Sequence, residues 1–181
     1  MSETMYFEEE GKPNTDATLQ AARDFAHSEG IENIVVASTT GFTAARAAEV
    51  FGDRNLVVVT HVTGRKGANL QEFPAELREE LEGKGVEVLT TSHAFDGVNQ
   101  LADQGSIGMV IRETLRMFCE GVKVCVEIAA MASDAGLIPT DGDVVSIAGT
   151  GKGADTAMVL RPAISRKLFE ARIKRIIAKP L

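Results

Sequence analysis

The chain has 181 residues, and 19 Lys and Arg residues against 26 Asp and Glu residues give it a net charge of −7. We expect one domain over residues 1–181, because this length can bury a substantial core and 44% of the residues are apolar. The acidic balance argues against nucleic-acid binding, which needs a basic surface. No apolar run approaches the roughly 20 residues of a spanning helix, so we expect no membrane partner.

The location is predicted from the start of the chain and from the cysteines. Residues 1–10 contain no lysine or arginine and no apolar stretch, so a secretory signal is not indicated and we expect a cytoplasmic protein. Cys119 and Cys125 lie in apolar sequence without neighbouring histidines. We therefore expect buried reduced thiols, with neither a disulfide scaffold nor a zinc site.

Helices and short β-branched strands alternate along the chain. In chain order the patterns predict a helix from about residue 14 to 27, a strand at 34–37, a helix at 43–50, a strand at 56–59, a helix at 74–81, a strand at 86–89, helices at 107–118 and 122–135, and strands at 143–148 and 156–160. This alternation indicates a parallel sheet covered on both faces. A short glycine-rich turn between the last two strands favours an antiparallel pair. The expected class is α/β with a mixed sheet.

The segment from Arg161 to Lys179 is basic, with seven Lys and Arg residues and only one acidic residue, Glu170. A nucleic-acid tail is one interpretation. The alternation of its cations with isoleucines favours a protected edge strand instead. These cations can pair with the acidic body or with a neighbouring subunit, which leaves a homo-oligomer open.

Polar or glycine-rich segments follow four of the predicted strands. The carboxyl ends of parallel strands share one sheet edge, where ligands bind, so we expect the four segments to form one binding site. The expected cofactor-binding residues are Ser38, Thr39, Thr40, Gly41, Thr43, Thr60, His61, Ser92, His93, Gly149, Thr150, Gly151, Lys152, Asp155 and Thr156.

The segment from Ser38 to Thr43 has the clearest mechanism, because a strand passes there into a helix. Amide N–H groups at a helix start lack internal partners and attract anions. Gly41 lets the backbone turn without a Cβ in the way, and the hydroxyl groups add donors. The segment therefore predicts a cradle for phosphate. The alternative is a simple N-capping turn, since Ser and Thr are preferred caps.

The loop from Gly149 to Thr156 matches no standard nucleotide motif. Ser146 stands where a Walker loop needs its first glycine, and the glycine spacing is not that of a dinucleotide fingerprint. Functionally, Lys152 would offer a point charge to a ligand and Asp155 an acceptor. Structurally, the loop is a hairpin connection.

His61 and His93 each follow a predicted strand and could hydrogen-bond a ligand or carry a proton, with an ordinary pKa near roughly 6.5. Two histidines without a cysteine do not indicate a metal site, and we expect none. Glu127 and Asp134 are seven residues apart, so they should share one face of the predicted helix. They could act as a general base and as an acceptor for a sugar hydroxyl group, or they could be ordinary solvated or paired acids. No catalytic residue is assigned.

Residues 34–44 (IVVASTTGFTA), followed by LVVVT at 56–60, resemble the C-terminal domain of pyruvate kinase, in which this loop holds a phosphate of an allosteric sugar bisphosphate. The sequences NT at 14–15, MASDAG at 131–136 and GADTA at 153–157 are similar to a stand-alone family of small, chiefly archaeal proteins described as pyruvate-kinase α/β-domain-like.

This resemblance implies a three-layer αβα sandwich with a mixed, mostly parallel sheet of about five strands, and FMN at the strand ends in some members. It implies no kinase activity, because the chain lacks the catalytic barrel. Phe42 stands where kinases often carry a polar or basic residue, which suits a ligand with a flat ring. We expect a protein that binds a phosphorylated small molecule, FMN. The alternatives are a flavin-dependent oxidoreductase using His61 or His93 as acid or base, and a non-catalytic regulatory module that senses a sugar phosphate.

Overall fold

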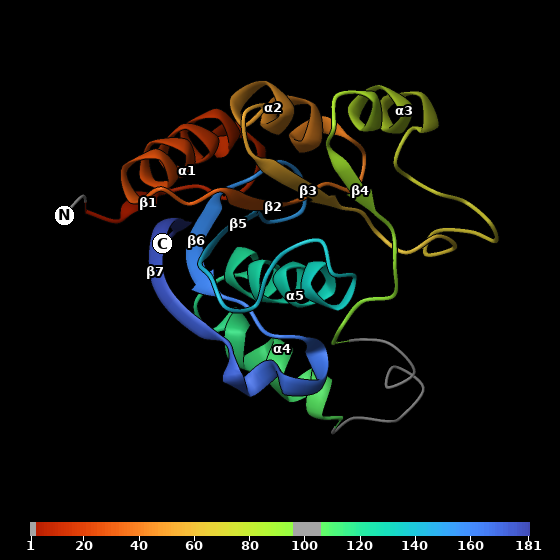
Figure 1. Ribbon diagram of the computed structural model, residues 1–181. Coiled ribbons are helices and arrows are strands. Elements are labelled where there is room, and N and C mark those ends of the chain that lie inside the picture. The colour runs from red at the N-terminus through yellow and green to blue at the C-terminus, as the bar shows by residue number, and fades with distance from the viewer. Residues whose placement is uncertain (1–2, 96–105) are drawn as a thin grey trace.

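The computed structural model describes residues 3–95 and 106–181, and its centre is a sheet of seven strands (Figure 1). The strands are β1 (Met5–Phe7), β2 (Asn33–Ala37), β3 (Asn55–Val59), β4 (Glu87–Leu89), β5 (Val144–Ala148), β6 (Thr156–Arg161) and β7 (Arg172–Pro180). They lie in the order β1-β7-β6-β5-β2-β3-β4. The strands predicted from apolar, β-branched runs are all present.

The sheet is mixed and mostly parallel, as predicted. The strands β5, β2, β3 and β4 form a parallel block, and β1 is parallel to β7. The strand β6 is antiparallel to both of its neighbours, which confirms the expected hairpin after β5. The sheet has more than the approximately five strands expected, because β7 and the short β1 extend it at one end.

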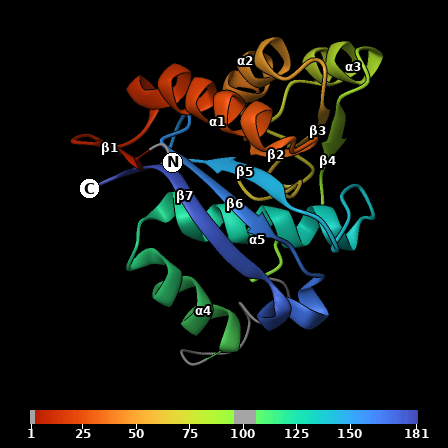
Figure 2. The same cartoon turned by 60° about the vertical axis from the view of Figure 1, so that its left-hand side comes forward.

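Helices cover both faces of the sheet and complete the three layers (Figures 1 and 2). One face carries α1 (Thr15–Glu29), α2 (Phe42–Val50) and α3 (Ala75–Gly83). The other carries α5 (Glu120–Asp134), which packs on β2, β3, β5 and β6, with α4 (Ile107–Arg116) outside it. The 3-10 helices η1 (Lys12–Asn14) and η3 (Ser165–Glu170) precede α1 and β7. No helix within the described residues is long and apolar enough to pass through a lipid bilayer.

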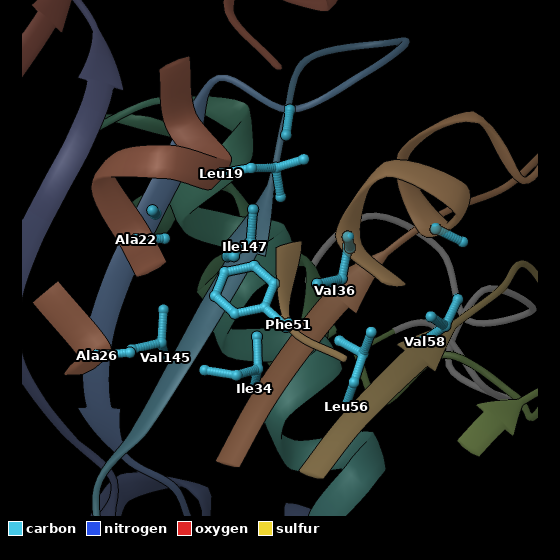
Figure 3. Close-up of a cluster of buried hydrophobic side chains, with 14 of the residues drawn as sticks. Leu19, Ala22, Ala26, Ile34, Val36, Phe51, Leu56, Val58, Val145 and Ile147 are labelled. Carbon is cyan, nitrogen blue, oxygen red and sulfur yellow. The ribbon is translucent and has the colours of Figure 1, made fainter. Parts of the chain in front are cut away.

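Two apolar clusters hold the layers together, one on each face of the sheet. Because side chains alternate along a strand, Ile34 and Val36 face α1 and α2, whereas Val35 faces α5. The ring of Phe51, from the end of α2, lies at the centre of the first cluster (Figure 3). Burial of this apolar surface fixes the strand ends, and so positions the loops that follow them.

The basic segment near the end of the chain forms η3 and β7. The strand β7 lies beside β6, and β1 covers only its last three residues, Ala178 to Pro180. Lys174 donates a hydrogen bond to Asp143 of the same chain. Ile173 stays largely exposed among these cations. The edge-strand interpretation therefore holds for residues 172–177, where charged side chains protect the open edge.

Candidate functional site

A cavity of about 630 Å³ opens at the carboxyl ends of β2, β3, β4 and β5, with α5 on one side. This volume lies in the range of small-molecule sites. The parallel block brings three of the four polar segments together at this edge, and His93 joins them from the segment after β4. The predicted site residues that line the cavity are Ser38, Thr39, Thr40, Thr43, Thr60, His61, His93, Gly149, Gly151 and Lys152.

The turn before α2 combines the two interpretations that the sequence allowed. The Ser38 hydroxyl is a cap, because it accepts a hydrogen bond from the amide of Ala44 at 3.1 Å. Thr39 and Thr40 line the cavity beside it. Since α2 begins at Phe42, the amides of its first turn have no partners inside the helix. The turn thus offers hydroxyl groups and amide donors to an anion.

Gly41 does not itself line the cavity. Its φ of +88° lies in the left-handed region, and a Cβ built on it would lie 2.3 Å from Cδ2 of Leu77 in α3. The backbone conformation therefore favours glycine here, and a Cβ would also displace the end of the Leu77 side chain. Replacing Gly41 would disturb packing, so such a variant would not test anion binding cleanly.

The loop after β5 is held by a buried carboxylate. Asp155 is fully buried, and its Oδ2 accepts hydrogen bonds from the amides of Gly11 at 2.7 Å and Thr150 at 3.0 Å. Its Oδ1 accepts one from the Thr156 hydroxyl at 2.7 Å. These residues were expected to contact the ligand, but Thr150, Asp155 and Thr156 are not among the residues lining the cavity. They shape the loop, whereas Lys152 reaches the cavity from its tip.

Two further candidates from the sequence, Ser92 and Asp134, do not line the cavity. Ser92 is exposed in the loop after β4. Asp134 is exposed at the far end of α5, where it accepts a hydrogen bond from the amide of Ser165. Glu127, two turns earlier on the same helix, does line the cavity. The pair proposed from their spacing is therefore not one site.

His61 lies against a buried carboxylate. Its Nδ1 is 3.3 Å from Oε2 of Glu72, whose Oε1 is 2.5 Å from Nζ of Lys66. Burial, with the positive charges of Arg65 and His93, outweighs Glu72 and lowers the pKa of His61 below 6.5. The pairing with Lys66 lowers the pKa of Glu72, so this acid is ionised at neutral pH.

His93 lies beside His61, with 5.4 Å between the ring centroids, and faces a second buried carboxylate. Its Nδ1 is 3.7 Å from Oε2 of Glu127, and Nζ of Lys123 is 2.5 Å from the same oxygen. Glu127 is only 2% exposed, and its Oε1 accepts a hydrogen bond from the amide of Phe95. Burial acts to raise the pKa of Glu127, but His93 and Lys123 outweigh it and lower the pKa to about 2.

Nε2 of His93 is buried and has no hydrogen-bond partner among the described residues. Because His93 lines the cavity, a ligand is the natural partner for this nitrogen. The sequence alone could not predict which ring nitrogen of His93 would face a ligand, because it did not show that the carboxylate of Glu127 lies beside Nδ1.

The cavity is positively charged although the protein is acidic. The basic residues lining it are Lys12, Arg65, Lys66, Arg112, Arg116, Lys123 and Lys152, and the acidic ones are Glu72, Glu120 and Glu127. Only Lys152 was among the expected site residues. Arg65 and Lys66 follow His61 in the polar segment after β3, whereas the other four come from η1, α4 and α5, far apart in the sequence. The weak signal that existed was the pair of opposite charges, Lys123 and Glu127, in an otherwise apolar helix.

The family model for the pyruvate kinase alpha/beta domain matches residues 16–160. The chain belongs to this family. The match runs from α1 to β6 and includes every strand whose end borders the cavity. The family resemblance carried by residues 34–44 and 56–60 is confirmed, and so is the α/β fold that it implied.

In this pyruvate kinase α/β-domain protein, Phe42 already has two cations against its ring. Nζ of Lys12 lies 4.2 Å from the ring centroid and Cζ of Arg46 lies 3.9 Å from it. Phe42 thus orients Lys12 at the cavity by cation–π attraction. A flat ligand ring would find its apolar surface elsewhere, on side chains of α5.

The residues able to hold a cofactor in this pyruvate kinase α/β-domain protein therefore fall into two groups. Hydroxyl groups, helix amides and cations after β2 and β5 suit an anionic group, and Val124, Ile128 and Met131 of α5 give an apolar wall. Over residues 3–95 and 106–181, no cluster of three or more His, Cys, Asp or Glu residues is arranged to hold a metal ion.

Proposed function

We propose that this protein binds a phosphorylated small molecule, FMN, at the C-terminal edge of its sheet. The observation that carries the proposal is the excess of cations in the cavity of a protein whose net charge is −7. A cleft with an excess of one sign of charge raises the local concentration of ligands of the other sign.

The phosphate would be held at the turn before α2. Thr39 and Thr40 offer hydroxyl groups, and the first amides of α2 add the positive end of the helix dipole. Lys12 and Lys152 approach the same region from η1 and from the loop after β5. Three separate segments therefore contribute to a site for one dianionic group.

The rest of the cavity fits the flavin part of FMN. The apolar wall of Val124, Ile128 and Met131 suits a flat hydrophobic ring, and the histidines supply polar partners for its edge. When bound, FMN supplies hydride and electron transfer, whereas the protein contributes binding and orientation.

FMN titration, followed by quenching of flavin fluorescence, tests this proposal. Lys152→Ala should weaken binding by roughly tenfold, because it removes a charged partner of the phosphate. Lys84→Ala is the matched control: Lys84 is exposed at the end of α3, pairs with Glu80, and should leave the affinity unchanged. A protein that is colourless when purified and does not bind added FMN would overturn the assignment of FMN.

Sensing of a sugar phosphate by a non-catalytic module is the second candidate. Lys12 and Arg46 lie against the Phe42 ring and leave less of it available to stack on a flavin, which favours this second candidate. The two histidines and the carboxylates of Glu72 and Glu127 could hydrogen-bond the hydroxyl groups of a sugar. Calorimetry with ribulose 5-phosphate separates the two candidates. Sugar-phosphate binding in a protein that does not take up FMN would favour the sensor.

The proposal extends to the setting of the protein, as a cytoplasmic member of the small stand-alone group that residues 131–136 and 153–157 resemble. Cys119 and Cys125 support a reducing compartment, since both are buried and free. Burial also raises the pKa of the Cys125 thiol, which keeps it protonated and unreactive.

A further inference from the structure

We propose that His61 and His93 form an acid–base pair that moves a proton on a phosphorylated hydroxy-carbonyl compound held in the cavity. Each imidazole has a buried carboxylate behind its Nδ1, Glu72 for His61 and Glu127 for His93. A base oriented by a third group is the arrangement that positions side chains for proton transfer. Nε2 of His93 has no partner among the described residues, and both histidines line the cavity, so we place both Nε2 atoms toward a ligand.

The position of the pair along the sheet edge selects the size of the substrate. The phosphate-binding turn follows β2, whereas His61 follows β3 and His93 follows β4, which are the next two strands of the parallel block. Adjacent strands lie about 4.8 Å apart, so the pair lies one to two strand spacings, about 5 to 10 Å, from the phosphate. A carbonyl group a few carbon atoms from a phosphate ester spans this distance.

The two histidines have different surroundings, which assigns their roles. Two imidazolium ions with ring centroids 5.4 Å apart repel each other, so the pair holds one proton more readily than two. His61, whose pKa is lowered by burial, is neutral at pH 7 and accepts a proton at Nε2. The one proton of the pair is then assigned to His93, whose Nδ1 faces the carboxylate of Glu127, and His93 is the donor.

The step needs no oxidant or second reactant. His61 takes the proton from the carbon next to the carbonyl group, and the electron pair of that C–H bond becomes the C=C bond of an enediol. The carbonyl π pair moves to its oxygen, which takes the proton of His93. Return of the proton to the original carbon, with return of the new hydroxyl proton to His93, regenerates the starting compound. Protonation of the former carbonyl carbon instead, with loss to His93 of the proton of the other enediol hydroxyl group, gives the isomer.

This inference rests on one part of the proposed function, namely that a phosphate ester binds in the cavity. The ligand it concerns is a sugar phosphate. The rate of proton exchange tests the acid–base pair, and it is measured separately from binding. The protein is incubated in D₂O with ribulose 5-phosphate or dihydroxyacetone phosphate, and NMR follows deuterium entering the carbon beside the carbonyl. Calorimetry on the same samples measures the affinity for each phosphate ester.

The wild type should catalyse exchange, and His61→Gln and His93→Gln should each lower its rate at least about 100-fold, the scale of general acid–base catalysis, while the affinity for the ester changes little. His27→Gln is the matched control, because His27 is exposed on α1 outside the cavity. All variants are prepared in the same way. A contaminating isomerase would give the same exchange rate in every preparation, whereas activity of this protein should fall in the two histidine variants.

Glu72 is a positioning residue, and the pH profile tests it. Its charge raises the pKa of His61, so Glu72→Gln should move the acid limb of the exchange rate to lower pH. Binding of either ester without exchange would overturn the acid–base pair and leave phosphate-ester binding intact. Failure of both esters and of FMN to bind would overturn both proposals, and exchange that survives in both histidine variants would overturn the pair.

Discussion

The two faces of the sheet are built from different chemistry. Under α1 and α2, the residues around Phe51 are apolar throughout, as the side chains labelled in Figure 3 show. Under α5, the buried residues include an ion pair, because the side chains of Lys123 and Glu127 are only 7% and 2% exposed. One face stabilises the fold, whereas the other combines packing with charges that reach the cavity.

The difference is informative because buried ion pairs are costly. Desolvation of two charges offsets most of their attraction, and well-packed apolar residues in their place are often as stable or more stable. Lys123 and Glu127 therefore contribute little that an apolar pair could not supply. Both side chains line the cavity, and Glu127 lies beside His93, so the proposed proton transfer gives the pair a role that packing does not.

The largest expected effect comes from breaking this pair. Glu127→Ala leaves Lys123 as an uncompensated buried charge and should lower the free energy of unfolding by about 3–5 kcal/mol. Urea unfolding followed by circular dichroism measures the change. The double variant Lys123→Met, Glu127→Leu should recover most of that stability, yet lose the proton exchange that depends on His93. Equal stability of the single and double variants would show that the pair does not behave as a buried ion pair.

A smaller effect is expected on the opposite face. Ile147→Val removes one methylene group from the apolar cluster and should cost about 0.5–1.5 kcal/mol, because the neighbours close the gap only in part. The same urea experiment gives the value, and FMN affinity should be unchanged. A loss of FMN affinity here would mean that the two faces are not separate in function.

The smallest expected effect concerns pH. The pKa of His61 is lowered in the folded protein, so between that value and 6.5 the unfolded chain binds more protons and stability rises with pH. The contribution is complete above pH 6.5 and is lost as pH falls through the folded pKa. Unfolding midpoints between pH 5 and 8 should therefore depend on pH less in His61→Gln than in wild type.

Most of the fold follows from local patterns in the sequence. The runs at 34–37, 56–59 and 144–148 are short, rich in β-branched apolar residues and flanked by helical patterns, and this combination is typical of buried strands in a parallel sheet. The partners of β7 were harder to predict, because β1 has only three residues and pairs with β7 from the opposite end of the sequence. Non-local pairing of this kind leaves no periodic signal.

The site was predictable only as far as it depends on strand ends. The turn at Ser38 and the two histidines follow from topology, because parallel strands end at one edge. Glu72 and Lys12 come from a loop and a 3-10 helix whose positions depend on tertiary contacts. Asp155 shows the opposite error, since an acid in a glycine-rich loop suggested a ligand contact but is satisfied by amides of its own chain.

The carboxylate of Asp155 joins parts of the chain that are made at very different times. It accepts from Gly11, the hydroxyl of Thr15 accepts from the amide of Ala154, and Lys12 between them lines the cavity. During synthesis on a ribosome, these contacts form only after residue 155 has emerged. The part of the cavity lining that Lys12 and Lys152 contribute can therefore be completed only after these two distant parts of the chain have come together.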